Sequence, residues 1–322
     1  MKAAIITAAG KPPILGEFNE PAAAPGLELI SVSASALSQF SKSRSAGTHY
    51  TSEAAFPAVA GADGVGRTQA GRRVYFALPE APFGALAEKC PVRAKQCVEI
   101  PDGLDDATAA AIANPGMSAW AALVERARLQ PGETVLVNGA TGSAGFLAVR
   151  LAKHLGAGKV IGTGRNETEL QALLSLGADA VISFTPGTPS GARNYEQSLK
   201  QAFAAGVNVV VDYLWGESAR TVIVAIAKAV EDATPVRFVH TGGASGEDEI
   251  SLPGAALRSS AIQLMGSGAK SVPMPKLLDG VKYVFEAAGP AKLQITTRIM
   301  PLSEIEKAWK APGKPRIVVA VQ

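Results

Sequence analysis

Three glycines at a regular spacing are the residues whose type and order most directly suggest chemistry in this chain. They form a GxxGxxG pattern at Gly139, Gly142 and Gly145. Because glycine has no Cβ, the backbone there can turn sharply and approach a pyrophosphate closely, and a helix that begins at this point offers free N–H groups to the phosphates. The pattern therefore suggests a dinucleotide site. The alternative is a glycine-rich turn in an α/β fold that binds no cofactor.

The segments on either side of the glycines favour the first interpretation. Thr134–Asn138 is a short apolar run typical of a strand, Ser143–Leu155 carries apolar residues at helical spacing, and Lys159–Thr163 has the composition of a second strand. Strand, glycine turn, helix and strand in this order are the context that makes such a motif credible. We expect cofactor contacts from the whole turn, namely Asn138, Gly139, Thr141, Gly142, Ser143, Ala144 and Gly145.

The end of the second predicted strand distinguishes between the two nicotinamide cofactors. A site for NAD usually has a carboxylate there for the ribose 2′-OH, whereas a 2′-phosphate needs hydrogen-bond donors and positive charge. This chain has Arg165 at that place, with Thr163 and Asn166 as polar neighbours. We therefore predict NADP(H), with the 2′-phosphate held by Arg165. The alternative is that Arg165 is only a solvated side chain after a strand.

Length and composition limit the remaining classes of protein. The chain has 322 residues, of which 47% are hydrophobic and 18% charged, and this is typical of a compact globular protein large enough for two domains. The net charge is only +3 and the basic residues are scattered, so we expect no nucleic-acid and no membrane partner. No apolar run approaches the roughly 20 residues that span a bilayer. We expect a cytoplasmic protein that acts on a small molecule.

The residues that usually bind metals are few and poorly spaced. Cys90 and Cys97 are the two cysteines, and they lack the spacing of a zinc ribbon. None of the three histidines, His49, His154 and His240, has a ligand partner at a useful spacing. We therefore expect no metal site.

The order of predicted elements indicates two architectures. Up to about Ala113, short strands separated by Pro and Gly turns indicate an all-β module. From there to Ser271, strands alternate with helices, which predicts an α/β fold with a doubly wound, mainly parallel sheet. A helix at Met274–Ala287 and a closing strand at Arg316–Val321 follow, and we expect this strand to pair with the N-terminal β module.

This order of parts resembles the medium-chain dehydrogenase/reductase superfamily, and within it the zinc-independent quinone oxidoreductases related to zeta-crystallin. The resemblance rests on segments along the whole chain, which are Pro57–Gly66, Phe83–Glu88, Asn138–Gly145, Leu176–Asp179, Gly242–Gly246 and Pro301–Ile305. It implies a GroES-like β-rich catalytic domain from residues 1–114 and 272–322 and a Rossmann NADP-binding domain from residues 115–271. It also implies a homodimer formed edge to edge through the central sheets, for which we expect Ala261–Met265 to be the edge strand.

The resemblance further implies which residues contact the cofactor and which ligand positions are lost. We expect Gly242, Gly243 and Ala244 beside the nicotinamide ring, and Phe184 in the adenosine pocket, where the family has a Tyr. Zinc-dependent members take ligands from a Cys and from the His of a GHE triplet. Those positions resemble Ser38 and the triplet Gly61–Asp63 here, which implies an enzyme that works without metal.

Three hydroxyl groups are the catalytic candidates that the resemblance implies. Ser38 stands where the family has Asn, Tyr50 lies close to a family Tyr, and Ser118 falls where the family has a Thr near the nicotinamide. Tyr50 either donates a proton or is an exposed loop tyrosine. Ser118 either contacts the cofactor or is a helix N-terminal hydroxyl with a local role.

These interpretations predict an NADPH-dependent, metal-independent reductase that transfers hydride to quinones or α,β-unsaturated carbonyl compounds. Conjugated acceptors suit a metal-free site because they spread the incoming charge over several atoms. The nearest alternative is an enoyl or alkenal reductase of the same superfamily. A second alternative is a low-turnover NADPH-binding sensor or structural protein, because Ser38 and Gln39 replace the Asn-Phe pair of the family.

Overall fold

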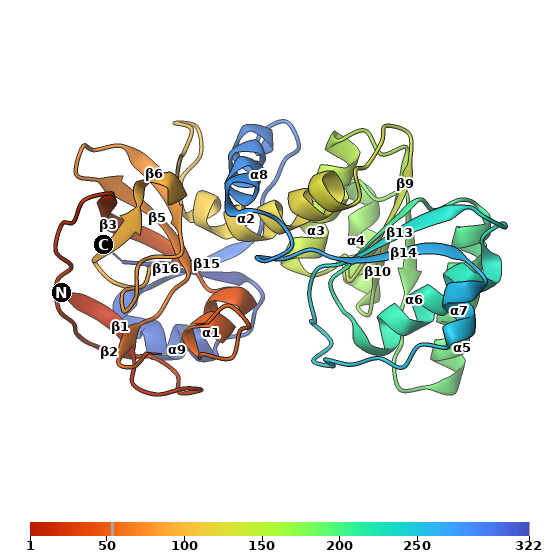
Figure 1. The fold of residues 1–322 in the computed structure, drawn as a ribbon, viewed down its shortest axis with the longest axis horizontal. Coiled ribbons are helices and arrows are strands. Elements are labelled where there is room, and N and C mark those ends of the chain that lie inside the picture. The colour runs from red at the N-terminus through yellow and green to blue at the C-terminus, as the bar shows by residue number, and fades with distance from the viewer. Residues whose placement is uncertain (53–54, 322) are drawn as a thin grey trace. The chain divides into compact units, whose positions relative to one another are not determined.

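The computed structural model describes residues 1–52 and 55–321, and the chain divides into two compact units (Figure 1). The first unit comprises Met1–Asn114, Val281–Gly289 and Gln294–Gln322, and the second comprises Pro115–Gly280 and Pro290–Leu293. Gln322, the end of the predicted catalytic domain, lies outside the described residues. Each unit has its own sheets, so each is a domain in the architectural sense.

The first unit is built from two sheets in which most strands pair antiparallel. The smaller sheet has the order β2-β1-β4, and the larger has the order β15-β16-β3-β5-β6-β8 with β7 paired to β3. The strands are β1 (Lys2–Ile6), β2 (Ile14–Glu17), β3 (Leu27–Ala36), β4 (Ala58–Val59), β5 (Asp63–Thr68), β6 (Arg73–Ala77), β7 (Lys89–Arg93), β8 (Cys97–Glu99), β15 (Thr297–Pro301) and β16 (Arg316–Ala320).

The two ends of the chain meet in the first unit. Strand β16 pairs antiparallel with β3, with Val318 opposite Ala36, so the predicted pairing of the closing strand with the N-terminal module is confirmed. One core cluster contains Ile6 from the beginning of the chain together with Ile317 and Val319 from its end. Burial of these side chains therefore ties the C-terminal segment to the β module.

The second unit contains one six-stranded sheet in which every pairing is parallel. Its order is β11-β10-β9-β12-β13-β14. The strands are β9 (Thr134–Asn138), β10 (Lys159–Gly164), β11 (Ala180–Ser183), β12 (Val209–Asp212), β13 (Pro235–His240) and β14 (Ala261–Gly266). Strands β9 and β12 lie at the centre, which explains why their sequences are unbroken apolar runs and do not alternate. The predicted α/β fold with a doubly wound parallel sheet is confirmed.

Helices connect the parallel strands and lie on both sides of the sheet in Figure 1. They are α3 (Ser143–His154), α4 (Glu167–Ser175), α5 (Pro189–Ala204), α6 (Gly216–Ala229) and α7 (Gly254–Arg258). Helices α3 and α4 both contact β10, whereas α5 and α6 pack on each other. The buried side chains of α5 and α6 form a core cluster with β10, β12 and β13, including Tyr195, Phe203 and Phe238.

The remaining helices lie in the first unit or cross the unit boundaries along the chain, except η2, which lies in the second unit. They are α1 (Gln39–Ser45), η1 (Ala94–Gln96), α2 (Asp106–Trp120), the π-helix η2 (Ala121–Arg126), α8 (Met274–Ala287), η3 (Leu302–Glu304) and α9 (Ile305–Lys310). Helix α2 continues through Pro115, with buried alanines on either side.

Helix α5 begins earlier than its apolar spacing predicts. It starts at Pro189, whereas the apolar spacing on its own predicts a start at Tyr195, the first of its buried residues. Thr188 caps the helix through a hydrogen bond that its Oγ1 accepts from the N–H of Gly191, and a proline suits the first helical position because its missing N–H is not needed there. Capping chemistry sets this boundary, and the exposed first turn carries no periodic signal.

In the part of the chain that the structure describes, no helix is both long and apolar enough to cross a membrane.

Candidate functional site

The strand order of the parallel sheet marks one position where a ligand can bind. From β9 the chain moves outward to β10 and β11 and then returns to the other side of β9 with β12. Side chains and loops at the carboxyl ends of the strands diverge at such a switch point, and ligands of open α/β sheets bind in the resulting crevice. Asn138, Gly164, Asp212 and His240 end four of the strands at this edge.

The glycine turn lies at the switch point and is closely packed. Gly139 has a positive φ of 87°, a conformation that favours glycine. A Cβ on Gly145 would lie 2.2 Å from the carbonyl oxygen of Gly139, so a side chain there would push helix α3 away from the turn. Gly142 precedes the helix, has no side-chain cap, and has only the Gly139 oxygen near its Cβ position, at 3.5 Å.

The N-terminus of α3 keeps its backbone donors available. The N–H of Phe146 bonds to the Gly142 carbonyl, whereas the N–H groups of Ser143, Ala144 and Gly145 have no acceptor among residues 1–52 and 55–321. The first turn of a helix is a favourable site for an anion, because these donors and the helix dipole both point toward it. The predicted residues of the turn therefore lie together and fit a phosphate group.

Asn138 directly precedes the glycine turn and is fully buried. Its Oδ1 accepts hydrogen bonds from Thr163 Oγ1 at 2.6 Å, from Tyr195 at 3.0 Å and from Ser218 at 3.0 Å. Its Nδ2 donates to Asp212 Oδ1 at 2.8 Å. Both polar ends of this side chain are engaged inside the protein, and its contact with the cofactor stays a prediction.

Three other predicted cofactor residues are also engaged within the protein. Thr163 is buried and its Oγ1 accepts from the N–H of Gly139 at 3.2 Å. Asn166 caps α4 by accepting from the N–H of Glu169. Phe184 is 6% exposed and its ring lies 4.7 Å from that of Tyr195, which leaves little of its face for an adenine. Arg165, in contrast, is exposed at the end of β10.

Asp212 was not predicted as a site residue, yet it organises the other half of this edge. Its buried carboxylate accepts from the backbone N–H groups of Leu214 and Trp215 and is 2.9 Å from Nδ1 of His240. Its carbonyl oxygen accepts from the N–H of Thr241 at 2.7 Å. Only the positions of Asp212 and His240 in the sequence indicate such a role, because each residue ends a strand of the parallel sheet.

The predicted nicotinamide loop follows His240 directly. Gly243 and Ala244 are exposed and Gly242 is partly exposed. The N–H of Ala244 bonds to the Tyr213 carbonyl and that of Ser245 bonds to the Leu214 carbonyl, so the loops after β12 and β13 are joined by backbone hydrogen bonds. Gly242, Gly243 and Ala244 therefore lie beside the residues that Asp212 holds.

Ser118 lies near the end of α2, in the second unit, which also contains the parallel sheet. The alternative of a helix N-terminal hydroxyl is wrong, because α2 begins at Asp106. Burial raises the pKa of Tyr213, and the nearby Ser118 hydroxyl offsets part of this rise. The two groups do not form a hydrogen bond of normal geometry, and the Tyr213 hydroxyl has no partner in the described chain. A buried polar atom without a partner fits a site that takes a polar ligand.

The two catalytic candidates of the first unit have different environments. Ser38 is buried and caps α1, since its Oγ accepts from the N–H of Ser41 at 2.9 Å. Tyr50 is 60% exposed and its ring lies 4.1 Å from that of His49. Burial, followed by the positive charge of Arg44, lowers the pKa of His49. The Ser38 hydroxyl thus caps a helix. Tyr50 stays a candidate proton donor at the surface of the unit.

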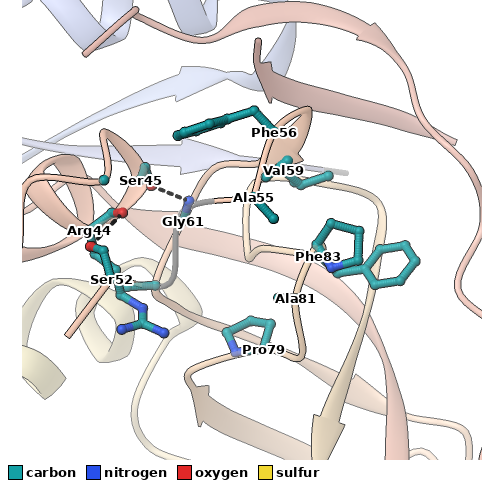
Figure 2. Close-up of a pocket in the computed structure, with 14 residues that line it drawn as sticks. Arg44, Ser45, Ser52, Ala55, Phe56, Val59, Gly61, Pro79, Ala81 and Phe83 are labelled. Carbon is teal, nitrogen blue, oxygen red and sulfur yellow. Dashed lines mark hydrogen bonds between the residues drawn. The ribbon is translucent and has the colours of Figure 1, made fainter. Parts of the chain in front are cut away.

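A pocket in the first unit lies close to these residues in the sequence (Figure 2). Phe56, Val59 and Phe83 give it an apolar wall, while Ser45 Oγ accepts from the N–H of Gly61 and Ser52 Oγ donates to the carbonyl of Arg44. Neither Ser38 nor Tyr50 is among its described lining residues. Mixed apolar and hydroxyl linings of this kind suit small organic molecules.

No metal site is visible in residues 1–52 and 55–321, where no three His, Cys, Asp or Glu side chains come close enough to share an ion. Ala62 occupies the central position of the triplet that carries a ligand in zinc-dependent relatives. Cys90 is buried and Cys97 is half-buried, and burial raises the pKa of both thiols, to about 11 for Cys97. Neither thiol is activated as a thiolate ligand.

A parallel sheet with an open helix N-terminus at its switch point is the arrangement of dinucleotide-binding α/β proteins. Comparison with known proteins shows what the chain is similar to. Residues 144–282 match the family model of the zinc-binding dehydrogenases. A probable NADPH-dependent quinone reductase, tdiC, of Emericella nidulans is 27% identical, and the match covers 96% of both chains. A phenolphthiocerol/phthiocerol polyketide synthase of Mycobacterium tuberculosis is 32% identical over 62% of this chain and 8% of that protein.

Solved structures agree with the sequence comparisons. The quinone oxidoreductase from Thermus thermophilus, whose structure is also known in complex with NADPH, matches over the full length of both chains with a TM-score of 0.81 and 23% identity. This likeness concerns the fold. With the sequence matches, it shows that the chain is similar along its whole length to quinone oxidoreductases and shares their fold.

Proposed function

We propose that this protein is an NADPH-dependent oxidoreductase that reduces quinones or α,β-unsaturated carbonyl compounds without a metal ion. The observation that carries the proposal is the open N-terminus of α3 at the switch point of the parallel sheet, closed on one side by Gly139 and Gly145. The relatives named as quinone reductases support the same chemistry.

The residues around the switch point fit a bound NADP(H). The N–H groups of Ser143, Ala144 and Gly145 are donors for the pyrophosphate, and the exposed guanidinium of Arg165 is a donor for the 2′-phosphate. The cofactor would supply the hydride. The tasks of the chain are to hold the nicotinamide beside Gly242–Ala244 and to provide hydroxyl donors, for which Ser118 and Tyr50 remain the candidates.

A conjugated acceptor is the substrate class that this chain suits best. Reduction of an isolated ketone concentrates negative charge on one oxygen, which usually requires a metal ion or a strong donor to stabilise it. A quinone or an enone spreads that charge over an extended system. The lack of a His at Ala62 and of a Cys at Ser38 therefore favours conjugated acceptors.

The decisive experiment is a steady-state assay of the purified protein with NADPH or NADH. Absorbance loss at the nicotinamide band is followed after addition of a panel of quinones and a panel of enones. We expect oxidation of NADPH with members of at least one panel and a preference over NADH. Tight NADPH binding without turnover on either panel would support the sensor or structural alternative.

An enoyl reductase is the second candidate, because a 200-residue segment of a polyketide synthase is 32% identical to this chain. Unsaturated thioesters included in the enone panel test this candidate directly. A kcat/KM for these thioesters well above that for every quinone would select the enoyl reductase.

We also propose that two copies associate through strand β14. This strand is the last in the sheet order, and Leu264 on it is 42% exposed. Unpaired edge strands with apolar side chains are candidates for pairing between chains. Light scattering should give the mass of a dimer for the wild type, and Leu264→Lys should shift the population toward monomer. A wild type that is monomeric at micromolar concentration contradicts this part of the proposal.

A further inference from the structure

His240 forms a hydrogen-bonded pair with a carboxylate that is fully buried. Its Nδ1 is 2.9 Å from Asp212 Oδ2, whereas its own side chain is 35% exposed. Within residues 1–52 and 55–321, no hydrogen bond is made by Nε2 of His240. Nδ1 of His240 is therefore engaged with Asp212 inside the protein, and Nε2 is available to a ligand.

The other contacts of Asp212 determine which ring nitrogen of His240 carries the proton. Oδ1 accepts from Nδ2 of Asn138 and from the N–H of Leu214, and Oδ2 accepts from the N–H of Trp215 at 3.1 Å. All these partners are donors, so the Asp212 carboxylate acts only as an acceptor. The neutral imidazole must then carry its proton on Nδ1, which leaves the lone pair of Nε2 as a hydrogen-bond acceptor.

Trp215 holds the imidazole from another side at a cost in backbone strain. Its φ of 60° and ψ of −157° lie in a region that is almost exclusive to glycine. The indole ring lies 4.3 Å from the imidazole ring, and the same carboxylate that fixes His240 bonds to the N–H of Trp215. Strain of this kind persists where surrounding contacts over-determine a conformation, and it concentrates at ligand sites.

The position of His240 in the sheet selects the part of the ligand that it meets. A dinucleotide crosses the carboxyl edge with its pyrophosphate at the glycine turn after β9, and Arg165 marks the adenosine side at β10. The nicotinamide must then lie on the opposite side, at the ends of β12 and β13, which are Asp212 and His240. The only amide donor of that part of the cofactor is its carboxamide NH₂.

We infer that Nε2 of His240 accepts a hydrogen bond from the nicotinamide carboxamide, with Asp212 fixing the tautomer and Trp215 fixing the ring. His240 is thereby a cofactor-binding residue and Asp212 a positioning residue. This inference rests on the proposed NADPH site. It adds a side-chain contact that recognises the carboxamide and sets the rotation of the nicotinamide ring.

The test compares NADP⁺ with its 3-acetylpyridine analogue, in which a methyl ketone replaces the carboxamide and no NH₂ remains. Dissociation constants are measured by calorimetry, without turnover. We expect the wild type to bind NADP⁺ about three- to tenfold more tightly than the analogue, the factor typical of one hydrogen bond. His240→Phe, which keeps a ring against Trp215, should lose that preference by weakening NADP⁺ binding alone.

A matched variant separates the contact from a general packing role. His240→Gln retains an acceptor at the end of a side chain of similar reach, and it should keep most of the preference for NADP⁺. Asp212→Asn offers a donor to Nδ1 and so favours the tautomer with Nε2–H, which should abolish the preference. Equal weakening of both ligands by His240→Phe would assign His240 a purely structural role.

The outcomes also separate this inference from the proposed function. A wild type that binds neither dinucleotide overturns both. Binding of NADP⁺ with no preference over the analogue overturns only the role of His240 and leaves the NADPH site in place. That comparison needs no variant, so it stands even where a substitution at His240 fails to fold.

Discussion

The side-chain amide of Asn138 donates a 2.8 Å hydrogen bond to the carboxylate of Asp212, and neither residue has any exposed surface. The bond joins the ends of two neighbouring strands, β9 and β12, at the point where the order of the sheet reverses. Asn138 precedes the glycine turn and Asp212 precedes the loop that contacts Gly242–Ala244. The phosphate half and the nicotinamide half of the proposed site are therefore connected by one buried amide.

Asn138→Asp should destabilise the protein severely. The variant places a second carboxylate against Asp212 in the interior and removes the only side-chain donor that Asn138 supplies. An uncompensated buried charge costs about 3–5 kcal/mol. Urea unfolding at neutral pH measures the loss. Asn194→Asp, at an exposed position of α5, is the control and should change the free energy of unfolding by no more than about 0.5 kcal/mol. Equal losses in the two variants would contradict the role of the buried bond.

Two glycines of the turn should respond differently to alanine. Gly145→Ala places a Cβ 2.2 Å from a backbone oxygen, so the turn and α3 must separate, and the free energy of unfolding should fall by about 1–3 kcal/mol. Gly142→Ala has ordinary contact distances and a φ of −71°, so stability should be nearly unchanged. Its Cβ reduces the space in front of the free N–H groups, and NADPH binding should weaken about tenfold or more.

Calorimetry with NADPH and urea unfolding on both variants check this pair of expectations. A Gly142→Ala variant that binds NADPH as tightly as the wild type would indicate that the phosphates do not approach this part of the turn. A Gly145→Ala variant of wild-type stability would contradict the packing that the turn shows.

Arg165→Ala should raise the KM for NADPH much more than the KM for NADH. The guanidinium is exposed at the end of β10, and a charge-assisted hydrogen bond to a phosphate typically contributes about 1.5–3 kcal/mol, or about ten- to a hundredfold. The selective effect should shrink as salt is added. Arg298→Ala, an exposed arginine on β15 of the first unit, is the control for a general loss of positive charge. Equal changes for both cofactors would show that Arg165 does not contact the 2′-phosphate.

The sequence predicts the parallel sheet well because its central strands β9 and β12 are apolar runs and helices alternate with strands along this part of the chain. The boundaries of β9 and α8 agree with the prediction residue for residue. Short polar elements such as α1 were missed. Its helical start depends on the cap that Ser38 provides, and a seven-residue helix has too little periodicity to identify.

The glycine turn of the candidate site could be predicted from the sequence. The hydrogen bonds that Asn138 and Asp212 make around it could not. A glycine pattern constrains the backbone locally, so it is visible in one segment of sequence. The contacts of Asn138 with Tyr195 and Ser218 join residues that are far apart in the chain and have no spacing rule. Metal-ligand spacing assigns no role to His240. Its partner is the carboxylate of Asp212 on the neighbouring strand, and such a pair has no fixed spacing in the sequence.

Protein purified without chelators should contain zinc well below one equivalent per chain, and activity should survive treatment with EDTA. The physical reason is the loss of ligands, since Ala62 has no donor atom and the Ser38 hydroxyl already caps α1. Metal analysis by mass spectrometry and a parallel activity assay provide the measurement. Stoichiometric zinc that resists dialysis would overturn the metal-free proposal.

Asp63 makes stability depend on pH in an unusual direction. Burial raises the pKa of its carboxyl from 3.8 to about 6, although the charge of Arg316 and a 3.1 Å hydrogen bond from Tyr75 act in the opposite direction. Its Oδ1 has no hydrogen-bond partner in the described chain. Desolvation of the charged form therefore outweighs the favourable partners.

Between about pH 4 and pH 6 the folded protein then binds more protons at Asp63 than the unfolded chain does. The free energy of unfolding should fall as pH rises through this window, by about 1–3 kcal/mol in total, and Asp63 should add no further change above it. Urea unfolding of the wild type and of Asp63→Asn at several pH values isolates this contribution, because the other titrating groups are common to both proteins. The difference between the two free energies should change across this window and level off above the raised pKa. A difference that stays constant from about pH 4 to about pH 7 would mean that Asp63 is ionised throughout and that Arg316 compensates its burial completely.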